Sequence, residues 1–458
     1  MKKLFLIILT GFAAGCTAET SVLNDYIRTA LEQNMALQQK NISLEKAHAA
    51  LCQARGMYLP QLSLQARYSR ADGGRQIDIP IGDLMNPVYA SLNQLLELPV
   101  FPTDLANESI PFLRREEHET KLRIVQPVFQ PGIYYNAKIK NQLEVISGHE
   151  RQLYARELIA AVKTSYYDIL KIDQALLLLN ESQALLQENL RVSKALEQAQ
   201  KTTMADVYRA EAELAKLEQR LAESRKQSEI ARMYFNFLLN RPLDTPVICN
   251  DSDTLPGIPS LEDITAHAMA HREELKQLRQ AVDIAAYHID LNRSSLLPTM
   301  TLVADYGFQG KDYSFTQKDD YWMASLIASW NIFNGFQDKN KIQQAKLAKH
   351  KSQLKVRELA TRIKMDVCEK YKAMEVAELS IKAAGLAQKS ADRAFEIVQK
   401  QYQQGMIAHI EYLDAQNRKT EAGLNTIIKL YDYRNKTAEL EKSACLFPVG
   451  SFLNLIDR

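Results

Sequence analysis

The chain of 458 residues contains an internal duplication. When the sequence is shifted by 238 positions onto itself, twelve identities fall among the 46 ungapped positions from 23 to 68. Further along, the matching shift is about 204, so that Phe129 matches Phe333 and Ala210 matches Ala415. The difference, about 34 residues, is extra chain in the first copy between Ser69 and Glu119. A chain of this kind must build the same supersecondary unit twice.

Both copies show the same order of patterns. Each begins with apolar residues at helical spacing, over about 21–56 and about 261–294. Apolar and polar residues then alternate, which predicts two strands per copy. These strands are expected at about 58–70, 119–130, 297–309 and 320–333. A long helix and a return helix follow as one hairpin, over about 133–239 and about 336–444.

The long helices are too long for a compact domain. The turn between the long helix and the return helix is expected after Gln198 in the first copy and after Gln404 in the second. All 14 prolines lie outside the four long helical segments, where each would cost about 3 kcal/mol or more. At about 1.5 Å per residue, each long helix would reach on the order of 100 Å.

The N-terminus carries an export signal. The start, MKKLFLIILTGFAAGC, has two lysines followed by a short apolar run. Two processing sites are compatible with it: ordinary cleavage near Cys16, or a relaxed lipobox that leaves Cys16 as a lipidated N-terminus. Later segments lack the ~20 consecutive apolar residues of a membrane helix, so any membrane-spanning part must consist of strands. Without the signal, 55 basic residues balance 55 acidic ones, because Lys2 and Lys3 are removed from 57, and no nucleic-acid partner is indicated.

The predicted organisation follows from these patterns. It consists of a signal segment 1–16, a first repeat 17–241, a connector 242–260, a second repeat 261–445 and a tail 446–458. The expected fold class is mainly α with a pair of β-hairpins.

Four strands with one apolar face cannot close a membrane barrel, because such barrels need about eight strands or more. Three copies would supply twelve strands, together with a ring of long helices. Aromatic residues near the strand ends fit the interface girdles of such a barrel, although single strand aromatics are also common without a membrane. They include Tyr68, Tyr306, Trp322 and Trp330.

The ordered motifs resemble the TolC family of outer-membrane efflux ducts. They are QPVFQPG and WNIFNG at the strand ends, and ADVYRAE and IEYLDAQ after the turns. The resemblance implies a homotrimer with a 12-stranded outer-membrane β-barrel continued by a periplasmic α-helical barrel. It implies an exit duct for efflux or type I secretion that works with a periplasmic adaptor and an inner-membrane pump. It implies neither an enzyme nor a cofactor.

The resemblance also assigns roles to the turns. Adaptor-docking residues are expected at both tips: Met204, Ala205, Asp206, Gly405, Met406, Ile407 and Glu411. The first copy departs from the pattern, because Gln200 stands where the second copy has Gly405. The alternative is that Gly405 only ends a helix and that Met406 and Ile407 pack against neighbouring helices.

A periplasmic gate is expected at Asp392 and Glu396, which are four residues apart and so share a helical face. By resemblance, acidic rings near the tip narrow such ducts and favour cations. The alternative is a solvated charged face balanced by Arg393 and Lys400.

Two other classes of function are compatible with parts of the sequence. His267 and His271 are spaced to share a metal, but the general-base glutamate of the zinc-protease motif is absent. A periplasmic adaptor or coiled-coil structural protein would also contain long helical hairpins. The two amphipathic β-hairpins argue against that alternative.

Overall fold

The computed structural model describes residues 22–250, 259–447 and 449. The predicted signal segment with Cys16, residues 251–258 of the connector, and most of the tail therefore lie outside the described residues. The chain divides into two compact units. Of the described residues, a helical unit comprises 22–48, 142–250, 259–283, 350–447 and 449, and a strand unit comprises 49–141 and 284–349.

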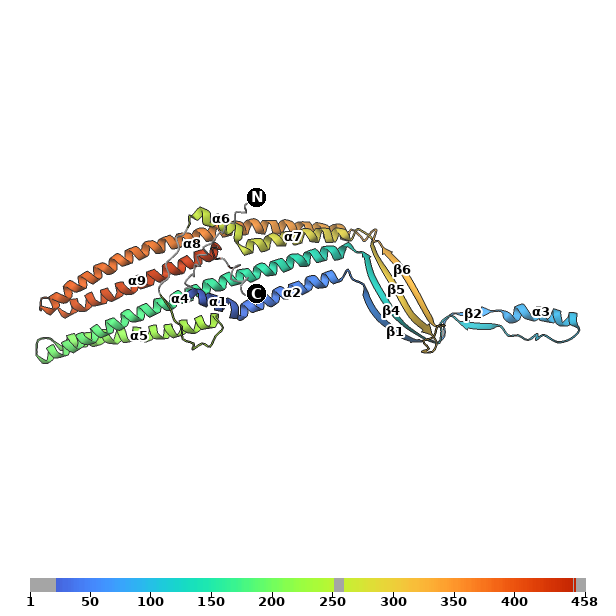
Figure 1. Cartoon of the computed structure of the whole chain (residues 1–458), viewed down its shortest axis with the longest axis horizontal. Helices are drawn as coiled ribbons and strands as arrows, with labels where there is room; N and C mark the ends of the chain where they lie inside the picture. The colour runs from blue at the N-terminus through green and yellow to red at the C-terminus, as the bar shows by residue number, and fades with distance from the viewer. Residues whose placement is uncertain (1–21, 251–258, 448, 450–458) are drawn as a thin grey trace, which may run out of the picture. The chain divides into compact units, whose positions relative to one another are not determined.

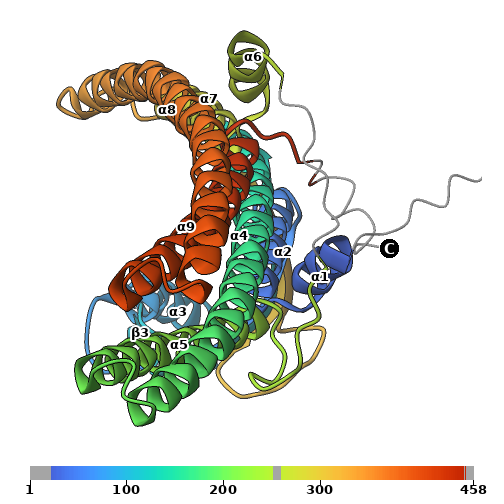
Figure 2. The ribbon, with the colours of Figure 1, turned by 90° about the vertical axis from the view of Figure 1, so that its left-hand side faces the viewer.

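The helices follow the same order in both copies (Figure 1). The first copy contains α1 (Val22–Gln33), α2 (Met35–Gly56), α4 (Pro131–Gln198) and α5 (Met204–Leu238). The second contains α6 (Leu261–His271), α7 (Glu273–Ser294), α8 (Gln337–Gln403) and α9 (His409–Ser443). Figure 2 shows α4 beside α5 and α8 beside α9 as two helical hairpins. Among the described helices, none is both long enough and apolar enough to cross a membrane.

The first helix of each copy is interrupted, whereas the sequence pattern predicted a continuous helix. The interruptions fall at Asn34 and Arg272, which the 238-residue shift aligns. The Asn34 side chain accepts hydrogen bonds from the amides of Ala36 and Leu37 at 3.0 and 3.1 Å and donates one to Leu238 O at 3.0 Å. It thereby caps α2 and fastens it to α5.

Arg272 interrupts the equivalent helix with different chemistry. Its backbone leaves the helical region, with φ −56° and ψ 120°. Its guanidinium donates to Ser443 O at 2.9 Å and pairs with the Asp366 carboxylate at 2.5 Å. The break therefore turns one side chain toward both α8 and α9.

The main core of the helical unit is built from α1, α4, α5 and α9 around buried aromatic rings. The ring of Tyr26 packs edge-on against Phe235 at 5.0 Å and lies 6.3 Å from the ring of Tyr166. Arg156 and Glu273, which belong to different copies, form a buried ion pair at 2.7 Å. The two repeats therefore pack against each other within one chain.

The strand unit holds one antiparallel sheet in the order β1-β4-β5-β6. Its strands are β1 (Gln61–Arg70), β4 (Glu116–Phe129), β5 (Thr299–Gly310) and β6 (Asp320–Ser329). The two predicted hairpins are joined through β4 and β5, so both copies contribute to one sheet. The predicted fold class, mainly α with a pair of β-hairpins, is confirmed.

The two faces of the sheet differ in chemistry. One row across the sheet pairs Leu64 with Leu122, Leu122 with Tyr306 and Tyr306 with Trp322. The neighbouring row points to the opposite face and contains Arg123 and Asp305, whose side chains form two hydrogen bonds at 2.7 and 2.8 Å. Period-two alternation therefore gives one apolar face and one charged face.

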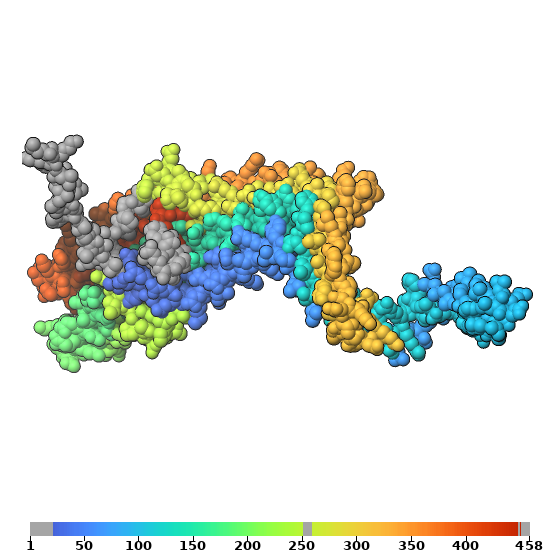
Figure 3. All heavy atoms as spheres, turned by 45° about the vertical axis from the view of Figure 1, so that its right-hand side comes forward, coloured from blue at the N-terminus to red at the C-terminus, as the bar shows by residue number. Residues whose placement is uncertain are grey.

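The extra chain of the first copy, residues 71–115, contains secondary structure that the sequence analysis did not predict. It contains a small hairpin of β2 (Gln76–Ile79) and β3 (Glu108–Pro111), with helix α3 (Ile81–Leu96) between them. Figure 3 shows it as blue and cyan spheres at the right. We call residues 71–115 the excursion.

Candidate functional site

The turn of the second hairpin is closed by backbone hydrogen bonds around Gly405. Its φ is +73°, its amide donates to Tyr402 O at 2.9 Å, and the Met406 amide donates to Gln401 O at 2.9 Å. This pair of bonds is the Schellman pattern that ends a helix with a left-handed residue. A Cβ built on Gly405 would meet no atom within 4 Å, so glycine is needed for its φ rather than for space.

The turn of the first hairpin has the same geometry without glycine. Gln200 has φ +57°, its amide donates to Glu197 O at 2.8 Å, and the Lys201 amide donates to Leu196 O at 2.8 Å. Glutamine in place of glycine at this position therefore changes the side chain but not the backbone shape of the turn. The two tips present matching backbones.

The predicted docking residues lie on or beside these turns. Met406 is 69% exposed and Met204 is 45% exposed, whereas Ile407 is half-buried. Ala205 and Glu411 are exposed in the first turns of α5 and α9. The Asp206 carboxylate accepts a hydrogen bond from the Thr202 hydroxyl at 2.6 Å. Exposed methionines at such a turn suit a partner surface.

His409, which the sequence analysis did not single out, joins the two hairpins. It begins α9, and its side chain is buried. Its Nε2 lies 2.9 Å from Oδ1 of Asn189 and 3.3 Å from Oγ of Ser193, both on α4. Its Nδ1 lies 3.8 Å from Oδ1 of Asp206 on α5. Burial lowers the pKa of the His409 imidazole, and the Asp206 carboxylate partly offsets that shift.

An apolar cluster continues the contact between the hairpins. Phe395 of α8 and Tyr412 of α9 pack with leucines of α4 and α5. The rings of Tyr402 and Tyr412 stack at 4.8 Å, and Tyr402 lies 5.7 Å from the His409 ring. A groove of about 900 Å³ lies beside them, lined by residues of both turns.

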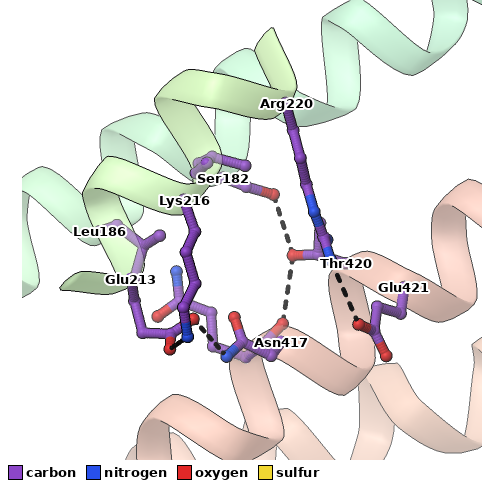
Figure 4. Close-up of a pocket in the computed structure, with 10 residues that line it drawn as sticks. Ser182, Leu186, Glu213, Lys216, Arg220, Asn417, Thr420 and Glu421 are labelled. Carbon is purple, nitrogen blue, oxygen red and sulfur yellow. Dashed lines mark hydrogen bonds and ion pairs between the residues drawn. The ribbon is translucent and has the colours of Figure 1, made fainter. Parts of the chain in front are cut away.

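A polar pocket of about 250 Å³ lies further from the tips, between α4, α5 and α9 (Figure 4). The hydroxyls of Ser182 and Thr420 are 3.0 Å apart, and Asn417 donates to Glu213 at 3.1 Å. We call this pocket, the apolar cluster and the His409 contacts the inter-hairpin seam. Any movement that separates the hairpins must break these contacts.

The predicted gate residues lie on α8 at the edge of this seam. Asp392 is half-buried and Glu396 is exposed, on either side of the buried Phe395. Within the described part of the chain, neither carboxylate forms an ion pair, and neither does Arg393 or Lys400. Within the described residues, the charges of this acidic pair are therefore not neutralised by an ion pair.

The predicted strand aromatics are exposed. Three lie on the sheet, whereas Trp330 directly follows β6, which ends at Ser329 instead of at about 333. Tyr68, Tyr306, Trp322 and Trp330 are 54%, 51%, 78% and 62% exposed. Tyr306 and Trp322 are paired in register, and the Trp330 indole donates to Leu296 O at 3.0 Å. Exposed aromatic rings on the apolar face fit a membrane interface.

The histidine pair has a structural partner. The rings of His267 and His271 lie 4.3 Å apart, and Nδ1 of His267 lies 2.8 Å from Ala444 O. Over the described ranges there is no group of three or more His, Cys, Asp or Glu side chains that could hold a metal.

The cysteines of the described residues, Cys52, Cys249, Cys368 and Cys445, form no disulfide with one another. Burial raises the pKa of the Cys445 thiol to about 12 and that of Cys249 to about 11. Both thiols therefore stay protonated at neutral pH and are poor nucleophiles.

Comparisons with known proteins agree with this arrangement. The model of the family "Outer membrane efflux protein" matches residues 265–444. The alkaline protease secretion protein AprF of Pseudomonas aeruginosa is 22% identical over 336 residues, which cover 71% of this chain and 69% of AprF. The outer membrane efflux protein BepC of Brucella suis is 23% identical over 255 residues, 55% of each chain.

The fold matches solved outer-membrane channels. The CmeC outer membrane channel of Campylobacter jejuni superposes with a TM-score of 0.76 at 16% identity, over 95% of this chain and 89% of CmeC. Residues 265–444 therefore match the outer membrane efflux protein family, and the chain shares the fold of solved outer-membrane channels.

Proposed function

We propose that the chain assembles as a homotrimer into an outer-membrane exit duct that receives its cargo from an inner-membrane pump through a periplasmic adaptor. The observation that carries the proposal is the four-stranded sheet, which has two unpaired edges, β1 and β6, and two chemically different faces. Unpaired strand edges are not tolerated in lipid, and only closure removes them.

Three copies of the chain give the smallest closed barrel whose lumen is wide enough for a channel of this family. Two copies would give eight strands and three would give twelve, since each chain contributes four. An eight-stranded barrel is filled by its own side chains, whereas a duct needs a wider lumen. The charged face with Arg123 and Asp305 suits a water-filled lumen, and the apolar face with Trp322 suits lipid.

The helices would supply the periplasmic part of the duct. Helix α4 has 68 residues and α8 has 67 residues. At roughly 1.5 Å per residue, each helix reaches about 100 Å. The matching turns at Gln200 and Gly405 then present their exposed methionines to an adaptor. Relatives bear names of both protease secretion and efflux, so the pump, rather than the duct, would choose the cargo.

The first test is the oligomeric state in detergent. Protein extracted from outer membranes is expected to have about three times the mass of the processed chain by light scattering, and to form conducting channels in planar bilayers. A stable monomer in the soluble periplasmic fraction would instead support an adaptor or coiled-coil structural protein. The exposed apolar face of the sheet argues against that second candidate.

A further inference from the structure

Helix α3 of the excursion has an apolar face that no described part of the chain covers. Leu84, Val88 and Leu95 are 64%, 50% and 80% exposed. Their spacing of four and seven residues puts all three on one side of the helix. The second copy joins its strands β5 and β6 with only residues 311–319, so the sheet does not need the excursion to form.

The opposite side of α3 is fastened to the chain that returns from it. The Asn86 side chain donates to Leu105 O at 2.9 Å and accepts from the Leu105 amide at 2.8 Å. Asn93, seven residues later, makes the same pair of bonds with Phe101 at 2.6 and 2.8 Å. A Cβ built on Gly82 would collide with Leu105 O, so the helix and its return segment are in close contact. These contacts fix which face of α3 points away.

Charge argues against a lipid surface as the occupant. Residues 76–113 contain no Lys or Arg and have five acidic residues, at positions 78, 83, 97, 104 and 108. Helices that bind anionic membranes carry basic residues beside their apolar face. The lack of basic residues therefore favours a protein surface over an anionic membrane as the occupant of this apolar face.

The position of the excursion supplies that second face. It is inserted between β1 and β4, and the Ala71 amide donates to Arg115 O at 2.9 Å at its base. Because β1 is an edge strand, it would pair with β6 of the next copy in the proposed trimer. Closure therefore brings three excursions together around one axis, at the strand ends that do not continue into helices.

We propose that α3 is a trimer contact, in which Leu84, Val88 and Leu95 of three copies pack against one another at the outer end of the barrel. This inference rests on the proposed trimeric duct. It adds a second interface to the trimer. This interface is formed by the excursion, which has no counterpart in the short connection between β5 and β6. The three helices would also narrow the outer mouth.

Disulfide trapping tests the contact. In chains with the exposed Cys52 and Cys368 changed to Ser, Leu95→Cys is expected to give a covalent dimer on oxidation of intact outer membranes. At most two of the three chains in a trimer can be linked. Ala90→Cys is the matched control, because Ala90 is exposed on the same helix. It points to a different side from Leu95, since the α-helix has about 3.6 residues per turn, and it is expected to remain uncrosslinked.

The outcomes separate this inference from the proposed function. The mass of each sample is also measured in detergent without oxidation. A trimer in which Leu95→Cys does not crosslink, or crosslinks no more than Ala90→Cys, would overturn the α3 contact and leave the duct intact. If Leu95→Cys does not crosslink and lipid alone protects its thiol from a soluble thiol reagent, the α3 contact is also refuted. Absence of a trimer would instead refute the proposed function.

Discussion

Two residues in left-handed conformation end the long helices, and only one of them is glycine. A residue with a Cβ reaches this conformation at a cost of about 1 kcal/mol relative to glycine. Gln200 has φ +57° and Gly405 has φ +73°, with equivalent hydrogen bonds. The first turn therefore contains a backbone cost that the second turn avoids.

Gln200→Gly is expected to stabilise the first turn by about 1 kcal/mol, because it removes this cost while keeping both hydrogen bonds. The measurement is amide exchange at position 201, where the N–H is bonded to Leu196 O. After correction for the intrinsic rate, exchange should slow about fivefold, the factor that corresponds to about 1 kcal/mol. Lys201→Gly serves as control, because Lys201 does not have a positive φ. Unchanged exchange in Gln200→Gly would show that the turn is not strained.

His409 is expected to make the inter-hairpin seam sensitive to acid. It faces Asp206 and Arg209 of α5, Tyr402 of α8, and Asn189 and Ser193 of α4. Burial lowers the pKa of His409 from its ordinary value of 6.5. An opened tip therefore binds the proton more readily than a closed one, and the closed contact loses stability as pH falls below about 6.5.

Hydrogen exchange at residues 189–193 and 406–413 checks this expectation. Opening should increase between pH 7 and pH 5 after correction for the intrinsic rate. In His409→Asn, which has no titrating ring, the increase should disappear. If the variant keeps the same pH dependence, another group controls the tip.

At the scale of elements, sequence periodicity was sufficient for the long helices and the four sheet strands, because their apolar residues recur at fixed spacing. It did not predict the break at Asn34, whose side chain is also fastened to Leu238 O, 204 residues away. It also missed α3, which contains Pro87 and is held by side-chain bonds to its return segment. Features set by contacts between distant residues leave no local period.

The candidate site likewise contains features that the sequence predicted and features that it did not. The turns were predictable, because a break in the helical pattern is a local signal in both copies and Gly405 adds to it in the second. His409 was not, since its partners Asn189 and Ser193 are 220 and 216 residues away. The acidic spacing of Asp392 and Glu396 was visible in the sequence, but its function depends on other copies of the chain.

The face of α8 with Asp392 and Glu396 is expected to control ion passage. In the proposed trimer each residue would form a ring of three carboxylates, and neither is neutralised by an ion pair within the described residues. Asp392→Ala with Glu396→Ala should raise single-channel conductance and weaken cation preference in planar bilayers, because the rings would lose both their bulk and their charge. Glu375→Ala with Glu378→Ala, on the same helix, is the control. Equal conductance in wild type and the first variant would refute a gate here.

At the scale of the whole molecule, assembly and docking are expected to depend on different parts of the chain. The proposed trimer closes through the edges of the sheet and the packing of long helices, whereas an adaptor would meet the tips. A change at a tip should therefore leave the channel assembled and still stop transport. Gly405 offers such a change, because no atom lies within 4 Å of the place that a Cβ would take there.

Gly405→Val is expected to leave trimers and membrane insertion intact while abolishing efflux in cells. A β-branched side chain at φ +73° is strained, so the turn would rearrange and displace Met406 and Ile407 from the surface that they present. Gly385→Val is the matched control: Gly385 also has no atom within 4 Å of a Cβ, but it lies within α8 without a positive φ. Efflux, trimer mass and adaptor crosslinking are measured on both variants. Full efflux in Gly405→Val, or failure of that variant to assemble, would contradict a docking role for this turn.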